Sequence, residues 1–126
     1  MRDLASNIGV RPALAPAVQA AATNGTSIDR KGFEKVTFIV NTGAIAGDGE
    51  FSFKVQESDD NSTWADAPAK YLIGEAPAEL EANSAYKIGY WGHKRYQRLA
   101  LTKAGGTSIA LGAVAVLAGA NARPVA

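Results

Sequence analysis

Apolar and polar residues alternate over much of the chain, and this pattern is typical of strands with one buried and one exposed face. In the run 33–41, the side chains of Val36, Phe38 and Val40 share one face. Five strands are predicted in this way, at 33–41, 51–56, 86–91, 96–102 and 109–117. Shorter strands are expected at 26–30 and 63–65, and 71–73 is weakly patterned.

Clusters of Gly, Asn, Asp and Pro separate these segments and predict turns or loops. The stretch 42–50, TGAIAGDGE, is expected to be a loop, and 57–62, ESDDNS, a turn. Adjacent glycines in 103–108, KAGGTS, predict a hairpin, because glycine supplies the positive φ that hairpin loops need. The stretch 75–84, EAPAELEANS, has room for one short helical turn.

About seven short strands and no amphipathic helix predict an all-β protein with a single antiparallel β-sandwich, of jelly-roll or immunoglobulin type. Pro12 and Pro16 exclude a regular helix near the start, so residues 1–25 are expected to form an extended N-terminal arm. The sandwich is expected at 26–118, with a C-terminal arm at 119–126. Residues 1–22 are expected to be disordered in the isolated protein and ordered in an assembly.

Composition narrows the function classes. The chain has 126 residues, which suggests one domain, and its net charge of +1 gives no field for holding nucleic acid or an anionic membrane. No cysteine is present, so disulfides, thiolate metal sites and a cysteine nucleophile are excluded. Asp3, Arg11 and the early prolines interrupt any signal-peptide core, and the apolar run 109–118 is about half a membrane span.

The acidic cluster Glu57, Asp59 and Asp60 is the first candidate for chemistry. Calcium loops need several oxygen ligands and a glycine at the sharp bend, and this turn lacks the glycine. The neighbouring carboxylates of Asp59 and Asp60 point apart on an extended chain, which disfavours an acid–base pair. The cluster is interpreted as a solvated, capped turn, whose carboxylates at most pair with Lys or Arg of a neighbouring subunit.

No catalytic, cofactor-binding or metal residue is predicted elsewhere. His93 is the single histidine, and no G-x-S-x-G motif accompanies it. It is interpreted as a loop residue, with a contact to a neighbouring subunit as the alternative. An aromatic and basic group of the kind that binds nucleic acid is better explained by strand residues; it comprises Tyr90, Trp91, His93, Lys94, Arg95, Tyr96 and Arg98. Trp64 is expected to fold back over the sandwich and be buried.

Three segments in order, FKVQESDDNSTWADA, YKIGYWGHKRYQRLALT and GGTSIALGAVAVL, resemble small virion proteins of tailed bacteriophages, the capsid decoration (cement or minor capsid) proteins. The resemblance covers about residues 33–124. It implies a non-enzymatic structural protein, made in the host cytoplasm, that binds the outside of the capsid and bridges capsomers. Its implied partners are the major capsid protein and itself, as a homotrimer, with no nucleic acid, membrane or cofactor. No functional residue of the family carries over.

Two alternatives stay open. One is a tail, neck or head-completion component, which differs from a decoration protein in copy number. The other is a carbohydrate- or host-binding module, for which Trp64, Tyr90 and Trp91 would form the stacking platform.

Overall fold

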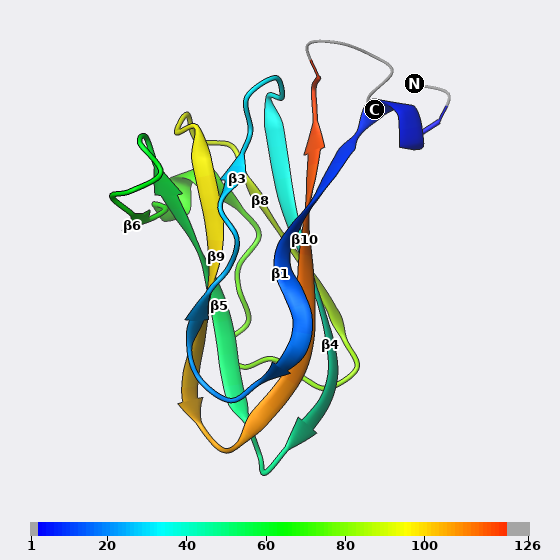
Figure 1. Cartoon of the computed structure of the whole chain (residues 1–126), viewed down its shortest axis with the longest axis vertical. Coiled ribbons are helices and arrows are strands. Elements are labelled where there is room, and N and C mark those ends of the chain that lie inside the picture. The colour runs from blue at the N-terminus through cyan, green and yellow to red at the C-terminus, as the bar shows by residue number, and fades with distance from the viewer. Residues whose placement is uncertain (1–2, 121–126) are drawn as a thin grey trace.

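The computed structural model describes residues 3–120, which form two antiparallel sheets packed face to face (Figure 1). Sheet A contains, in spatial order, β1 (Gly9–Gln19), β10 (Ser108–Ala118), β4 (Lys35–Ala46), β8 (Ala85–Tyr90) and β7 (Leu72–Ile73). Sheet B contains β2 (Thr23–Asn24), β9 (Tyr96–Gly105), β5 (Glu50–Ser58) and β6 (Ala65–Asp66), and β3 (Ile28–Asp29) also pairs with β9. Short 3-10 helices occupy Ala5–Asn7 and Ala69–Tyr71. The prediction of an all-β antiparallel sandwich is confirmed.

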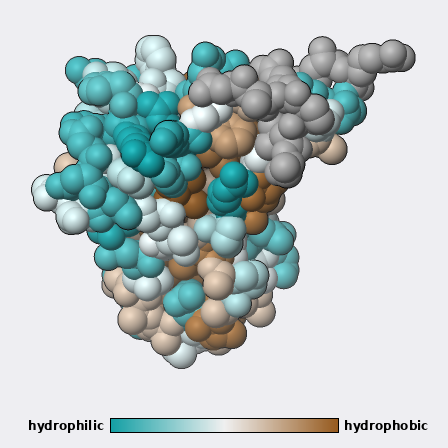
Figure 2. Space-filling model, turned by 45° about the horizontal axis from the view of Figure 1, so that its top comes forward, coloured by the Kyte–Doolittle hydropathy of each residue, from teal (hydrophilic) through white to brown (hydrophobic). Residues whose placement is uncertain are grey.

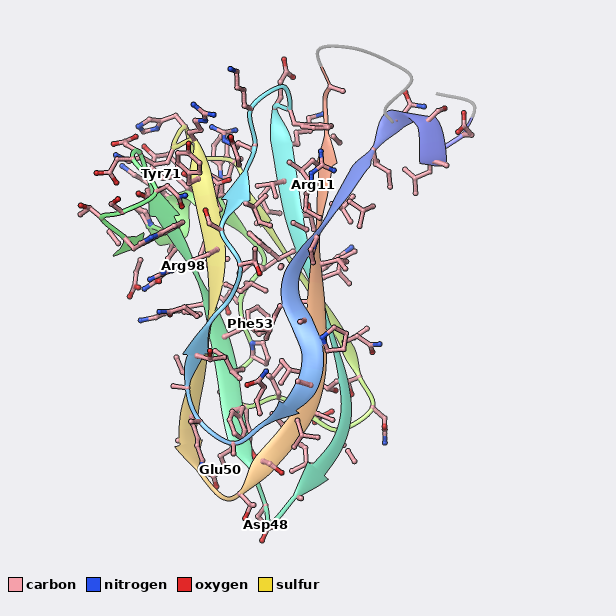
Figure 3. All side chains as sticks on the ribbon, in the orientation of Figure 1. Arg11, Asp48, Glu50, Phe53, Tyr71 and Arg98 are labelled. Carbon is pink, nitrogen blue, oxygen red and sulfur yellow. The ribbon has the colours of Figure 1, made fainter. Side chains whose placement is uncertain are left out.

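The core lies between the sheets and is built by the alternation seen in the sequence. Phe53 projects into this space, as Figure 3 shows. Each large apolar side chain buried here contributes about 2 kcal/mol relative to exposure. The buried set includes Val36, Phe38, Val40, Phe51, Phe53, Val55, Ile88, Leu99, Leu101, Ile109, Leu111 and Leu117.

Two tight corners carry the chain from one sheet to the other. Strands β4 and β5 are joined by residues 47–49, and β9 and β10 by residues 106–107. Gly106 has φ +74°, and a Cβ there would overlap the carbonyl oxygen of Asp48 in the other corner. The turn predicted in KAGGTS is therefore present, but β9 and β10 do not pair as a hairpin: β9 pairs with β5, and β10 with β4 and β1.

The N-terminal arm is the main difference from the prediction. Residues 9–19 are not a free arm but the edge strand β1, which pairs antiparallel with β10. Proline is compatible with an edge strand, because its missing N–H can face away from the sheet, and the register shifts of β1 lie between Pro12 and Ala17. Ala13 and Leu14 of β1 belong to the core. Of the predicted C-terminal arm, residues 121–126 lie outside the described residues.

Smaller differences concern the loops. The predicted loop 42–50 is mostly strand, because β4 continues through Ala46. The expected helical turn at 75–84 is absent; this irregular segment lies along the sandwich, with Leu80 buried. It is held by the Leu80 N–H, which donates to the Phe51 carbonyl at 2.7 Å, and by the Ser52 hydroxyl, which donates to the Pro77 carbonyl at 2.5 Å.

Candidate interaction surface

The outer face of sheet B is covered by a polar network. The Arg98 guanidinium donates to Gln56 at 2.8 Å, and the Gln56 amide donates to Asp66 at 3.1 Å. Lys54 forms an ion pair with Asp66 at 3.2 Å, and the Arg98 guanidinium lies 4.4 Å from the centre of the Trp64 ring. Arg98 points away from the core in Figure 3, and hydrophilic residues gather on the side of β5, β6 and β9 in Figure 2. These charged and polar side chains are typical of a surface that faces solvent.

The outer face of sheet A is apolar. Because side chains alternate along each strand, the register fixes which residues share this face. We call it the sheet A face, and it consists of the cross-strand rows Ala118–Lys35, Val10–Val116–Thr37–Gly89–Ile73, Pro12–Val114–Ile39–Lys87 and Gly112–Asn41–Ala85, with Pro16 beside Gly112 and Val18 opposite Ala110. Among these residues only Lys35 and Lys87 are charged; Lys35 is the first residue of β4, and Lys87 stands on β8.

Several large apolar side chains on this face are open to solvent. The exposed fractions are 70% for Val18, 53% for Val10 and 38% for Val114. A groove of about 670 Å³ runs across β1, β10 and β4, with Ala110 and Gly112 in its lining. Contiguous apolar patches larger than a few hundred Å² mark interaction sites on soluble domains. The sheet A face is therefore the candidate functional site.

The sequence carries a signal for this face that the prediction did not use. The run 109–117 is apolar at almost every position rather than at alternate ones. A strand that is apolar on both sides is typical of burial on both sides. In β10 one side is buried in the core, and the other faces outward as part of the sheet A face.

The acidic turn is capped by its own residues, as predicted. The Asp60 carboxylate accepts hydrogen bonds from the Thr63 and Ser62 N–H groups, both at 2.9 Å, and from the Ser58 hydroxyl at 3.0 Å. These donors, the Thr63 and Ser62 N–H groups first, lower the pKa of Asp60 to about 2. This carboxylate holds the turn together.

Glu57 differs from the prediction, because it is buried rather than solvated. It is 8% exposed, and its carboxylate accepts a 2.7 Å hydrogen bond from the Tyr90 hydroxyl. Burial, followed by this hydrogen bond, raises the pKa of Tyr90 to about 12. The sequence held a signal for this position, since Glu57 continues the inward phase of Phe53 and Val55.

The other acidic and basic candidates pair within the chain. Asp59 forms an ion pair with Lys94 at 2.6 Å, and Asp29 with Arg95 at 2.7 Å. The hydrogen bonds from Arg95 lower the pKa of Asp29 to about 2. In the structure Asp59 thus has a partner inside its own chain, and two members of the basic group, Lys94 and Arg95, are held in separate ion pairs.

The aromatic residues proposed as a glycan platform do not lie together. Tyr90 is buried, whereas Trp91 is 62% exposed and packs edge-on against Tyr71, with ring centres 6.4 Å apart. His93 also meets the Tyr71 ring, at 5.7 Å. Trp64 lies over the outer face of sheet B, as expected, but it is half-buried there rather than buried. Stacking on Arg98 explains its position, because a guanidinium is attracted to the face of an aromatic ring.

Among residues 3–120, no three His, Asp or Glu side chains are grouped so that they could hold a metal ion. Within the same range, every helix falls short of the length and apolar character that a membrane span requires.

Comparisons with known proteins agree on the fold. The chain matches no protein-family profile and no curated protein sequence. Its structure is similar to that of the PBSX exported protein XepA, with a TM-score of 0.59 and 21% identity over 94% of this chain. The chain spans only 39% of the length of XepA. It is also similar to the SPBc2 prophage-derived protein YomS, with a TM-score of 0.52 and 11% identity, covering 88% of this chain and 92% of YomS. At sequence identities this low, the structural similarity establishes a common sandwich fold alone.

Proposed function

We propose that this chain is a structural virion protein of a tailed bacteriophage, which binds the outside of the capsid and stabilises the head by bridging capsomers. The observation that carries the proposal is the sheet A face, an apolar surface on a domain whose opposite outer face is polar. Covering such an apolar surface with another protein removes it from water and is therefore favourable. The order of the segments resembles that of decoration proteins, and YomS is a prophage-derived protein with this fold.

The geometry suits a scaffolding role. The sheet A face is built on three long strands, so it is formed before binding and loses little conformational entropy when a partner covers it. The proposed partners are the major capsid protein and other copies of this chain. Several modest contacts made at once by one rigid domain give strong attachment through avidity.

The proposal gives the protein no catalytic step. The carboxylates that raised the question of chemistry are committed to the fold: Asp60 caps a turn, Glu57 accepts from Tyr90, and Asp59 pairs with Lys94. Contacts between the protein and its partners, rather than any reaction, account for the proposed function.

The test removes the protein from the particle. Particles assembled without it are expected to release their DNA at a lower temperature, or after milder osmotic shock, while host adsorption is unchanged. Adding the purified protein is expected to restore the heat resistance. Stable heads with lost adsorption would favour a host-binding module instead, and heads that fail to join tails would favour a neck or head-completion role.

A further inference from the structure

We infer that the occupant of the sheet A face is a second copy of this chain, so that two sandwiches pack through their sheet A faces about a two-fold axis. The inference rests on the proposed role in a protein assembly and names the partner of the apolar surface. It differs from the trimer that the resemblance implies, because a face that meets itself closes with two copies.

The low charge of the sheet A face favours a second copy as its occupant. A two-fold contact brings each residue off the axis against a different residue of the other copy, so a charge on the face finds a partner only if the face also carries the opposite charge. The outer face of sheet B contains Lys54, Asp66 and Arg98, whereas the sheet A face has two lysines, Lys35 at the start of β4 and Lys87 on β8, and no acidic residue. A partner with a charged surface would leave its charges unpaired against these strands. The sheet A face of a second copy is, by contrast, nearly free of charge.

The area of the sheet A face is large enough for a stable pair. Strands β1, β10 and β4 contain 11, 11 and 12 residues. With about 3.3 Å per residue and about 4.8 Å between strands, these three strands and the neighbouring part of β8 present on the order of 600 Å². Two such faces together bury about 1,200 Å², which reaches the range of specific, stable protein–protein interfaces.

The shape of the sheet A face is complementary to a second copy of itself. On β10, Ala110 and Gly112 lie in the groove, and Val114 and Val116 follow as bulkier residues. A Cβ on Gly112 would come within 2.9 Å of the Pro16 ring. A side chain is therefore disfavoured at residue 112, and the surface remains hollow there. A two-fold axis that lies between the faces and crosses β10 at Val114 brings Val116 of each copy over Gly112 of the other. The bulky Val116 side chain of each copy then fills the hollow at Gly112 of the other copy.

The experiment measures the mass of the purified full chain in solution by sedimentation and light scattering over a range of concentrations. The wild type is expected to be a pair that dissociates on dilution. Val114→Lys is expected to weaken the pair by about a hundredfold or more, because each pair buries two copies of Val114. The matched control Thr102→Lys places the same charge on the outer face of sheet B, opposite Ser52, and is expected to leave the pair intact.

Circular dichroism and thermal unfolding establish that each variant is folded. If Val114→Lys does not fold, Val18→Lys, at a side chain that is 70% exposed, carries the same test at another point of the face. A wild-type chain that is monomeric or trimeric throughout overturns the inference, as does a Val18→Lys or Val114→Lys chain that is folded and still paired.

Cross-linking tests the position of the axis. The chain has no cysteine, so Val114→Cys introduces a single thiol, and Thr102→Cys is its control. A short bifunctional maleimide is expected to link two copies of Val114→Cys and to leave Thr102→Cys unlinked. The reverse result overturns the inference. These measurements use the isolated protein, so a pair that forms while head stability is unaffected contradicts the proposed function and leaves the inference intact.

Discussion

Replacing Tyr90 by Phe removes one oxygen from a buried polar contact and keeps the ring. Tyr90 is 2% exposed, and its hydroxyl donates to Glu57 at 2.7 Å. The same hydroxyl accepts from the Lys94 N–H at 3.3 Å. The substitution leaves the Glu57 carboxylate without this donor at a position that water barely reaches.

The expected loss in the free energy of unfolding is about 2–3 kcal/mol. A hydrogen bond to a charged group is worth about 1.5–3 kcal/mol, and leaving the buried acceptor unpaired places the loss in the upper part of that range. The control is Tyr96→Phe, on a half-buried ring stacked by the Arg95 guanidinium, for which a change within about 0.5 kcal/mol is expected.

The assay is urea unfolding of the wild type and of both variants at pH 7, repeated at rising pH. The folded-state pKa of Tyr90 is about 12, above the unfolded value of 10.0, so the folded protein holds this proton more tightly. The stability that this difference provides is complete below pH 10 and is lost as the pH rises from 10 to 12. Tyr90→Phe removes that part of the decline. A Tyr90→Phe variant within 0.5 kcal/mol of the wild type at pH 7 would refute the buried contact between Tyr90 and Glu57.

Three further substitutions test separate parts of the structure. Leu14→Ala is expected to lower the free energy of unfolding in urea by about 2–4 kcal/mol, because Leu14 of β1 is a core residue. An unchanged stability would mean that residues 9–19 form a free arm after all. Gly106→Ala is expected to cost about 1–3 kcal/mol, since φ is +74° and the Asp48 carbonyl occupies the site of the new Cβ; Gly105→Ala is the control, and equal effects would contradict the corner geometry. Asp60→Ala is expected to lower the melting temperature at pH 7, and because the pKa of Asp60 is about 2 in the folded state, the difference from the wild type should shrink as pH falls from 4 to 2; a constant difference would exclude the carboxylate cap.

The strands and the core were predictable because alternation is a local property of the sequence. Phe51, Phe53 and Val55 point inward as their spacing indicates. The same alternation places the next inward position at Glu57. The prediction nevertheless made Glu57 solvated, because a glutamate in a turn is usually exposed to water. Its burial depends on Tyr90, a residue 33 positions away, which local patterns do not reveal.

The pairing of strands was not predictable from local patterns. Two adjacent glycines indicate a tight turn, and they do not specify whether the chain returns in the same sheet or crosses to the other. The crossing follows from contacts between the two corners, where Gly106 lies against the backbone of Asp48 and Gly49. In β1, Pro12 and Pro16 correctly exclude a helix, but an edge strand accepts them, and the apolar partner that β1 needs is β10, at the far end of the chain.

The candidate site was predictable in part. The apolar run 109–117 was recognised as a strand, and its outward residues were not recognised as a surface, because the face exists only once β1, β4 and β10 lie side by side. The sequence pointed instead to the acidic turn and the aromatic residues. Most of these side chains make their contacts within the chain, as Asp60, Glu57 and Trp64 do.

A reconstruction of the phage particle would locate this protein in the virion and so test its proposed role on the head. We expect density for this two-sheet domain on the outer surface of the head, repeated over the whole shell, with the sheet A face covered by protein. Density confined to the neck or tail, or a sheet A face open to solvent in the assembled particle, would contradict it.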